Sequence, residues 1–215
     1  MTPPHSPADH AGRILVRADE TDVDTLSQVI AEAFFDLLPS RWLAEDPAAR
    51  CAIFPGYFRL SVEHALECGL VHTTPDRAAA ALWLPAGPGA PTPPESYSAR
   101  LAALTGALAG RFEAFDAALE AGHPAAVPHQ HLAILAVRPG RQGQNVGATL
   151  LAARHATLDI DGIPAFLQAS GPDSRRLYLR HGYADYGPRI DLPGGPALYP
   201  MWRQPRDPQD AGRQQ

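Results

Sequence analysis

The chain has 215 residues, a formal net charge of −5, 45% hydrophobic residues and 19% charged residues, which is ordinary for a globular domain in water. The acidic balance, without a basic stripe interleaved with aromatic residues, argues against a nucleic-acid partner. No apolar run approaches the roughly eighteen residues that a membrane span needs, so we expect no membrane contact.

Both ends of the sequence are polar. Residues 1–12 lack the basic and apolar regions of a signal peptide, so they are predicted to form a disordered lead-in, and residues 204–215 a flexible tail. The segment 13–203 is predicted to be a single domain in the cytoplasm. Cys51 and Cys68 have no metal-like spacing, so the sequence predicts free thiols and no metal site.

The first predicted elements are a strand and two helices. Residues 14–18 are typical of a strand, and Thr21 or Asp22 then caps a helix with one apolar face. A second helix is predicted over residues 48–68, kinked or interrupted at Pro55, because proline lacks the N–H that the helix interior needs.

A hairpin and a long helix follow. Residues 70–74 and 78–84 are predicted to pair as strands, and the helical pattern over 101–119 has a break at Gly106 or Gly110. The remaining predicted elements are a strand over 131–137, a helix from 146, a strand over 163–170, a short helix capped by Asp173 or Ser174, and a hairpin of 183–190 with 197–202.

The loop that joins the strand at 131–137 to the next helix is the most informative segment. Free backbone N–H groups at a helix start, with the positive end of the helix dipole, bind phosphate. A Walker loop is excluded because the chain contains no lysine, and the spacing of Gly143 and Gly147 does not fit the dinucleotide fingerprint. The loop therefore predicts a different nucleotide-like cofactor, and the alternative is an ordinary glycine-bearing turn.

This loop resembles the acetyl-CoA loop of the GNAT acyltransferase superfamily, whose pattern is V-x-P-x-x-[QR]-G-x-G-[IV]-G-x-x-L-L. Asn145 stands where the pattern has its middle glycine; asparagine tolerates left-handed backbone and caps helices, so the loop can still form. Its side chain takes space that glycine leaves for the pyrophosphate, which implies weaker CoA binding or a donor without the full nucleotide. The matching residues are Val137, Pro139, Gln142, Gly143, Val146, Gly147, Leu150 and Leu151.

A second segment, residues 174–183, resembles the N-x-x-x-Y-x-x-x-G-[FY] signature of the same superfamily, with Ser174 in place of asparagine. Over residues 14–203 the chain looks most like the actinobacterial puromycin N-acetyltransferase group, on the basis of residues 81–85, residues 163–168 and the final hairpin. That resemblance, with a composition that uses arginine for every basic residue, implies a bacterial protein of antibiotic resistance or biosynthesis.

The resemblance implies an α/β fold of the GNAT type, with a mixed, mostly antiparallel sheet of six to seven strands and helices on both faces. It implies an N-acyltransferase in which an amine of a small molecule directly attacks the thioester of acetyl-CoA or another acyl-CoA. Tyr178 is the implied general acid, since a phenol with a pKa near 10 can protonate the departing thiolate. The implied cofactor residues are Leu135, Ala136, Val137, Gln142, Gly143, Gln144, Asn145, Val146, Gly147 and Ser174.

The base that takes the proton of the amine is less defined, since similar enzymes often have glutamate where this chain has Gln168. His131 is the predicted base, with proton loss to water as an alternative that needs no side chain. Other candidate bases are His64, His72, Glu32 and Asp36. The predicted acceptor contacts are Glu32, Phe34, Phe35, Trp83 and Gln168, although the aromatic residues also fit a hydrophobic core.

Two alternative functions stay open. Because Asn145, Gln168 and Ser174 depart together from the usual pattern, the donor is alternatively an acyl-phosphopantetheine on an acyl carrier protein of natural-product biosynthesis. A non-catalytic acyl-CoA-binding domain would keep the phosphate loop without needing Tyr178. The chain is expected to be a monomer or a homodimer, since many similar enzymes pair through their final strands.

Overall fold

The computed structural model describes residues 15–206. The predicted lead-in, the first residue of the predicted first strand and most of the predicted tail lie outside this range. The strands are β1 (Val16–Arg17), β2 (Leu70–Thr73), β3 (Ala79–Ala86), β4 (His129–Val137), β5 (Ala165–Ala169), β6 (Ala184–Asp185), β7 (Ile190–Asp191) and β8 (Ala197–Arg203). The helices are α1 (Val23–Phe34), α2 (Leu38–Leu43), α3 (Pro47–Cys68), α4 (Tyr97–Thr105), α5 (Ala109–Ala121), α6 (Val146–Asp161) and α7 (Pro172–Arg180), with short 3-10 turns η2 (Glu20–Asp22) and η3 (Gly106–Leu108).

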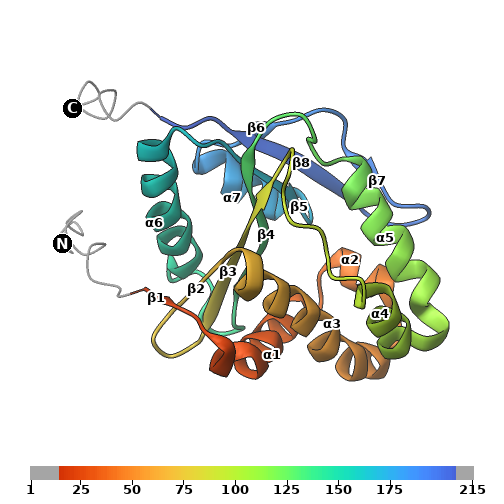
Figure 1. Ribbon diagram of the computed structural model, residues 1–215. Coiled ribbons are helices and arrows are strands. Elements are labelled where there is room, and N and C mark those ends of the chain that lie inside the picture. Colours follow the sequence, from red (N-terminus) through yellow and green to blue (C-terminus); the bar gives the residue numbers. More distant parts are fainter. Residues whose placement is uncertain (1–14, 207–215) are drawn as a thin grey trace, which may run out of the picture.

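The strands form one mixed sheet in the order β1-β2-β3-β4-β5-β8-β6, with β7 paired to β8 (Figure 1). Every neighbouring pair is antiparallel except β4 and β5, which are parallel. This parallel pair is short, because only Gln130 with Ala165 and His131 with Phe166 are in register. Beyond His131 the two strands separate, so no strand of the described chain lies beside the rest of β4 on that edge.

Side chains that alternate along β3 separate two hydrophobic cores, one on each face of the sheet. Ala80 and Leu82 pack with α1, α3 and α5, whereas Ala79, Ala81 and Trp83 pack with α6 and α7. The alternation follows from the two-residue repeat of a strand, whose successive side chains point to opposite faces. Helices therefore cover both faces, as the sequence predicts.

Several predicted features differ in detail. The helix α3 continues through Pro55 without interruption, whereas Gly106, with φ +52, does end α4. The short helix α2 was not predicted from the sequence. Asp19 caps the 3-10 turn η2 that leads into α1, and its carboxylate accepts hydrogen bonds from the backbone N–H and the hydroxyl of Thr21 at 2.9 and 2.6 Å. Among residues 15–206, no helix has both the length and the hydropathy required to cross a bilayer.

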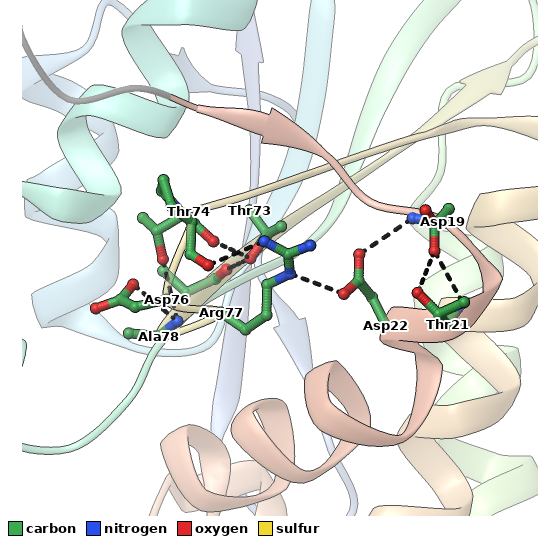
Figure 2. Close-up of polar contacts among 10 residues, drawn as sticks. Asp19, Thr21, Asp22, Thr73, Thr74, Asp76, Arg77 and Ala78 are labelled. Carbon is green, nitrogen blue, oxygen red and sulfur yellow. Dashed lines mark hydrogen bonds and ion pairs between the residues drawn. The ribbon is translucent and has the colours of Figure 1, made fainter.

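Asp22, a predicted cap, does occupy the cap position of α1, but its side chain makes no capping bond to that helix and forms an ion pair with the turn between β2 and β3. Figure 2 shows the Arg77 side chain reaching from that turn to Asp22, with 2.7 Å between Nε and the carboxylate oxygen. Arg77 also has left-handed backbone, at φ +53, and donates to the carbonyl of Pro75. Because Asp22 is only 6% exposed, this contact fixes the start of α1 against the sheet.

Replacing Arg77 with methionine is expected to lower the free energy of unfolding by about 1–3 kcal/mol, because the buried Asp22 carboxylate then keeps only the N–H of Asp19 as a partner. Urea unfolding measures the change. The control is Arg41→Met, which removes an exposed pair with Asp36 and should cost at most about 0.5 kcal/mol. Equal losses in the two variants would contradict this account.

Candidate functional site

The site is a cleft of about 450 Å³ that opens where β4 and β5 separate. The end of α1, the strand β4, the loop before α6, the strand β5 and the helix α7 all contribute to its walls. The predicted site residues that line it are Phe34, Leu135, Ala136, Val137, Gln142, Gly143, Asn145, Val146, Gly147, Gln168, Ser174 and Tyr178. Residues from three separate parts of the sequence are thus brought to one space.

One end of the cleft is the loop that leads into α6. Asn145 takes the left-handed conformation there, with φ +59 and ψ +13, and α6 begins at the next residue. Gly143 is also left-handed, at φ +74. Within the described residues, none of the backbone amides from Gln142 to Ala148 donates to a protein acceptor. These free N–H groups lie at the positive end of the α6 dipole, which is an arrangement that favours a bound anion.

Two side chains hold the shape of this loop. The amide of Gln142 donates to the carbonyl of Val137, the last residue of β4, at 3.2 Å. Arg141 forms an ion pair with Asp76 at 2.8 Å and lines the cleft. Asp76 lies in the same β2–β3 turn as Arg77, so one turn contacts both the start of α1 and the phosphate loop. Sequence patterns gave no indication of the contact between Asp76 and Arg141, because it joins residues far apart in the chain.

The other end of the cleft contains Tyr178 and Ser174 of α7. Tyr178 is 8% exposed, and burial raises the pKa of its phenol above the ordinary value. Its hydroxyl has no hydrogen-bond partner among the described residues, while its ring packs edge-on against Tyr183 with 5.7 Å between ring centroids. Ser174 was a predicted cap, but it lies inside α7, where its hydroxyl accepts a bond from the N–H of Gly171 at 3.2 Å.

His131, the predicted base, lies at the closed end of the β4–β5 pair and does not line the cleft. Its ring packs edge-on against His123, with 4.6 Å between the ring centroids. Burial, and next the neighbouring His123 and His129, lower the pKa of His131 to about 3. An imidazole of this pKa is a poor acceptor for the proton of an ammonium group, so the geometry does not support His131 as the base.

Three predicted acceptor contacts are also outside the cleft. Trp83 is fully buried, because strand alternation places it on the α6 face, where its ring contacts His155. Trp83 is therefore a core residue and does not contact the acceptor, contrary to the prediction. Glu32 and Phe35 line a separate groove on the outer side of α1. Gln168 does reach the cleft, and its side-chain amide donates to the carbonyl of Leu119 at 2.7 Å.

Gln144 was predicted to bind the cofactor, and it belongs to the loop before α6 but does not line the cleft. Other residues that do line the cleft were not predicted. No aspartate, glutamate or histidine is among the lining residues of this cleft in the described chain, and its ionisable side chains are those of Arg141, Tyr178 and Arg180. Elsewhere in residues 15–206, no group of three histidine, cysteine or acidic side chains is placed to hold a metal ion. The lining residues missed from the sequence are Ala33, Leu37, Leu132, Ala133, Arg141, Ala148, Leu167, Ser170, Leu177 and Arg180.

No protein-family model matches the sequence. The fold is shared with a structure from Corynebacterium glutamicum named histone acetyltransferase HPA2 and related acetyltransferase, at 23% identity and a TM-score of 0.67, over 91% of this chain and 98% of that one. Arylalkylamine N-acetyltransferase 2 from Aedes aegypti is 13% identical, with a TM-score of 0.61, over 91% of this chain and 100% of the other. A GCN5-related N-acetyltransferase from Rhodopseudomonas palustris is 13% identical, with a TM-score of 0.54, over 89% and 95% of the two chains. These similarities confirm the predicted GNAT-type fold.

Three histidines, of which His155 is buried and His123 and His131 are partly buried, are expected to make the protein sensitive to mild acid. Burial is the largest cause that lowers the pKa of His123 to about 4 and those of His131 and His155 to about 3. The unfolded chain therefore binds protons below pH 6.5 that the folded chain does not, so stability falls as the pH falls. Between pH 7 and pH 5 we expect a loss of about 1–2 kcal/mol for each histidine.

Urea unfolding at pH 7, 6 and 5 measures this loss. The variant His155→Gln removes one of the three titrating groups, so its free energy of unfolding should depend less steeply on pH, whatever its value at pH 7. An identical pH dependence in the variant and the natural chain would show that His155 does not contribute.

Proposed function

We propose that this protein is an N-acyltransferase that moves an acetyl or other acyl group from a CoA thioester to an amine of a small molecule. One observation carries the proposal: a single cleft has the free amides of a phosphate-binding loop at one end and the Tyr178 phenol at the other. The fold shared with named N-acetyltransferases supports it.

The donor would lie along the unpaired edge of β4. The free amides of the loop from Gln142 to Gly147 would hold the pyrophosphate, together with the α6 dipole. The backbone of Leu135 to Val137 would bond to the pantetheine arm as a neighbouring strand would, because β5 has separated from it there. A backbone N–H near the thioester carbonyl would then stabilise negative charge that develops on its oxygen.

The transfer would proceed by direct attack in a ternary complex. The amine nitrogen forms a bond to the thioester carbon, and the tetrahedral intermediate then breaks the carbon–sulfur bond. Tyr178 donates its proton to the departing thiolate; its raised pKa keeps the phenol protonated until that step. Since none of the described residues that line the cleft has a carboxylate or an imidazole, the proton of the amine would be lost to water.

The acceptor would enter beside the end of α1, where Phe34 and Leu37 line the cleft. Its identity is proposed only as a small-molecule amine, such as an aminonucleoside or another antibiotic of the kind that the puromycin group acetylates. We further propose a cytoplasmic bacterial protein that acts as a monomer or a homodimer.

The test is an acyl-transfer screen of amines with acetyl-CoA, read as thiol release and as the mass of the product. With an accepted amine, Tyr178→Phe should lower kcat by roughly 10²- to 10⁴-fold and leave CoA binding unchanged, because only the acid is lost. The matched control is Tyr183→Phe, whose phenol packs beside Tyr178 but bonds to His155 outside the cleft.

The control variant Tyr183→Phe should have the same kcat as the natural chain. Equal turnover in Tyr178→Phe and the natural chain would remove Tyr178 from the mechanism. CoA binding without transfer to any amine would instead favour a non-catalytic acyl-CoA-binding domain.

A carrier-protein donor is the second candidate, and the Asn145 side chain favours it, since it lines the cleft beside the free amides. The variant Asn145→Gly distinguishes a CoA donor from a carrier-protein donor, because glycine removes the side chain and adopts the same left-handed backbone without strain. If CoA is the donor and the side chain crowds it, the variant should bind CoA roughly three- to tenfold more tightly by calorimetry, about 1 kcal/mol.

Transfer from an acetylated carrier protein is measured in parallel. Unchanged or weaker CoA binding in Asn145→Gly, together with faster turnover from the carrier than from acetyl-CoA, would contradict the CoA proposal and support the carrier.

A further inference from the structure

We propose that the groove on the outer side of α1 is a second ligand site, which binds a small zwitterion through a carboxylate on Arg50 and an ammonium group beside Glu32 and Asp36. The groove has a volume of about 560 Å³ and lies between α1, the start of α3 and the first residues after β4. It shares no lining residue with the cleft, so the inference does not depend on acyl transfer.

The main observation is a buried arginine without an acidic partner. Arg50 is 4% exposed, and within residues 15–206 no carboxylate lies at ion-pair distance from it. One terminal nitrogen, Nη1, donates to the carbonyls of Ala44 and Glu45 at 2.6 and 2.9 Å, which caps the end of α2. Its Nε is buried and has no partner among the described residues. The bonds to Ala44 and Glu45 explain the position of Nη1, but they leave a buried positive charge without an acidic partner, which is unfavourable.

The free part of this guanidinium selects the chemistry of the ligand. With Nη1 occupied, the edge formed by Nε and Nη2 offers two parallel N–H donors, which match the two oxygens of a carboxylate. The ring of Phe35 covers the guanidinium, with 4.8 Å from the carbon of the guanidinium to the ring centroid. Phe35 is only partly buried and lines the groove, so the carboxylate would reach the edge as this ring turns aside.

The rim of the groove supplies the opposite charge. Glu32 accepts bonds from Gln28 at 3.1 Å and pairs with Arg138 at 3.2 Å, and the exposed Asp36 pairs with Arg41. Arg138 lines the groove as well, so Glu32 and Asp36 balance the two arginines of the lining, and the remaining lone pairs of these carboxylates suit an ammonium group. The remaining walls are largely apolar, through Ala31, Phe35, Pro55 and Pro139. A ligand that fits this groove therefore has a carboxylate, an ammonium group and an apolar side chain, which are the groups of a free amino acid.

Cys51 makes the test specific to this site. It is exposed and lines the groove, whereas Cys68 lies outside it and serves as an internal control. The rate at which iodoacetamide alkylates each cysteine of the full chain is followed by peptide mass spectrometry. L-phenylalanine at ten times its Kd should slow the alkylation of Cys51 by roughly tenfold and leave Cys68 unchanged.

Two analogues and two variants identify the contacts. L-phenylalaninamide, which lacks the carboxylate, should not protect Cys51 at the same concentration, and Arg50→Met should abolish protection by L-phenylalanine. Because Arg50 also caps α2, the double variant Glu32→Gln with Asp36→Asn gives an independent test on exposed residues. In the double variant, L-phenylalanine should protect Cys51 less than in the natural chain. Protection by 3-phenylpropanoate, which has no ammonium group, should not weaken.

The control Asp24→Asn lies on the same helix but outside the groove. In this variant L-phenylalanine should protect Cys51 as strongly as in the natural chain. The proposal is overturned if L-phenylalanine gives no protection of Cys51 up to its solubility limit. It is equally overturned if L-phenylalaninamide protects Cys51 as well as L-phenylalanine does. The same holds if L-phenylalanine protects Cys51 equally in the double variant and in the natural chain.

Discussion

The structure depends on the separation of β4 from β5. These strands are joined in register at only two residue pairs, Gln130 with Ala165 and His131 with Phe166, and every residue of β4 beyond them has an open edge. An open strand edge is a row of unpaired donors and acceptors that a protein normally covers. Here the edge forms one wall of a cleft, so an extended ligand can take the place that β5 vacates.

The two ends of the cleft are held by different means. The phosphate loop is shaped by its own backbone, through the left-handed Gly143 and Asn145, and by contacts with the β2–β3 turn. The same turn anchors α1 through the pair between Arg77 and Asp22, so a single tight turn positions two walls (Figure 2). Tyr178, at the other end, is placed by α7 and by packing against Tyr183 in the second core.

Charge is divided between two sides of α1. Within residues 15–206 the lining of the cleft includes arginines and a protonated phenol but no acidic side chain, which suits a donor with phosphate groups. The acidic residues Glu32 and Asp36 lie instead on the outer groove with Arg50. In the two proposals an anionic cofactor and an ammonium-bearing ligand would meet different surfaces. The short loop after β4 connects these surfaces, since Arg138 lines the groove and Arg141 lines the cleft.

Features that depend on local backbone chemistry could be predicted from the sequence alone. The hairpin of β2 and β3, the break at Gly106 and the strand–loop–helix unit around Asn145 follow from turn residues, glycine and helix capping, which act over a few neighbouring residues. The positions of His131 and Trp83 relative to the cleft could not be predicted from the sequence. Periodicity shows that a residue is apolar or lies in a strand, but it does not show which face of the sheet a helix will cover or where two strands part. Only the tertiary structure decided that Trp83 lies under α6, that His131 lies at the closed end of the strand pair, and that Arg50 is buried with no acidic partner among residues 15–206. The physical reason is that burial is set by elements distant in the chain.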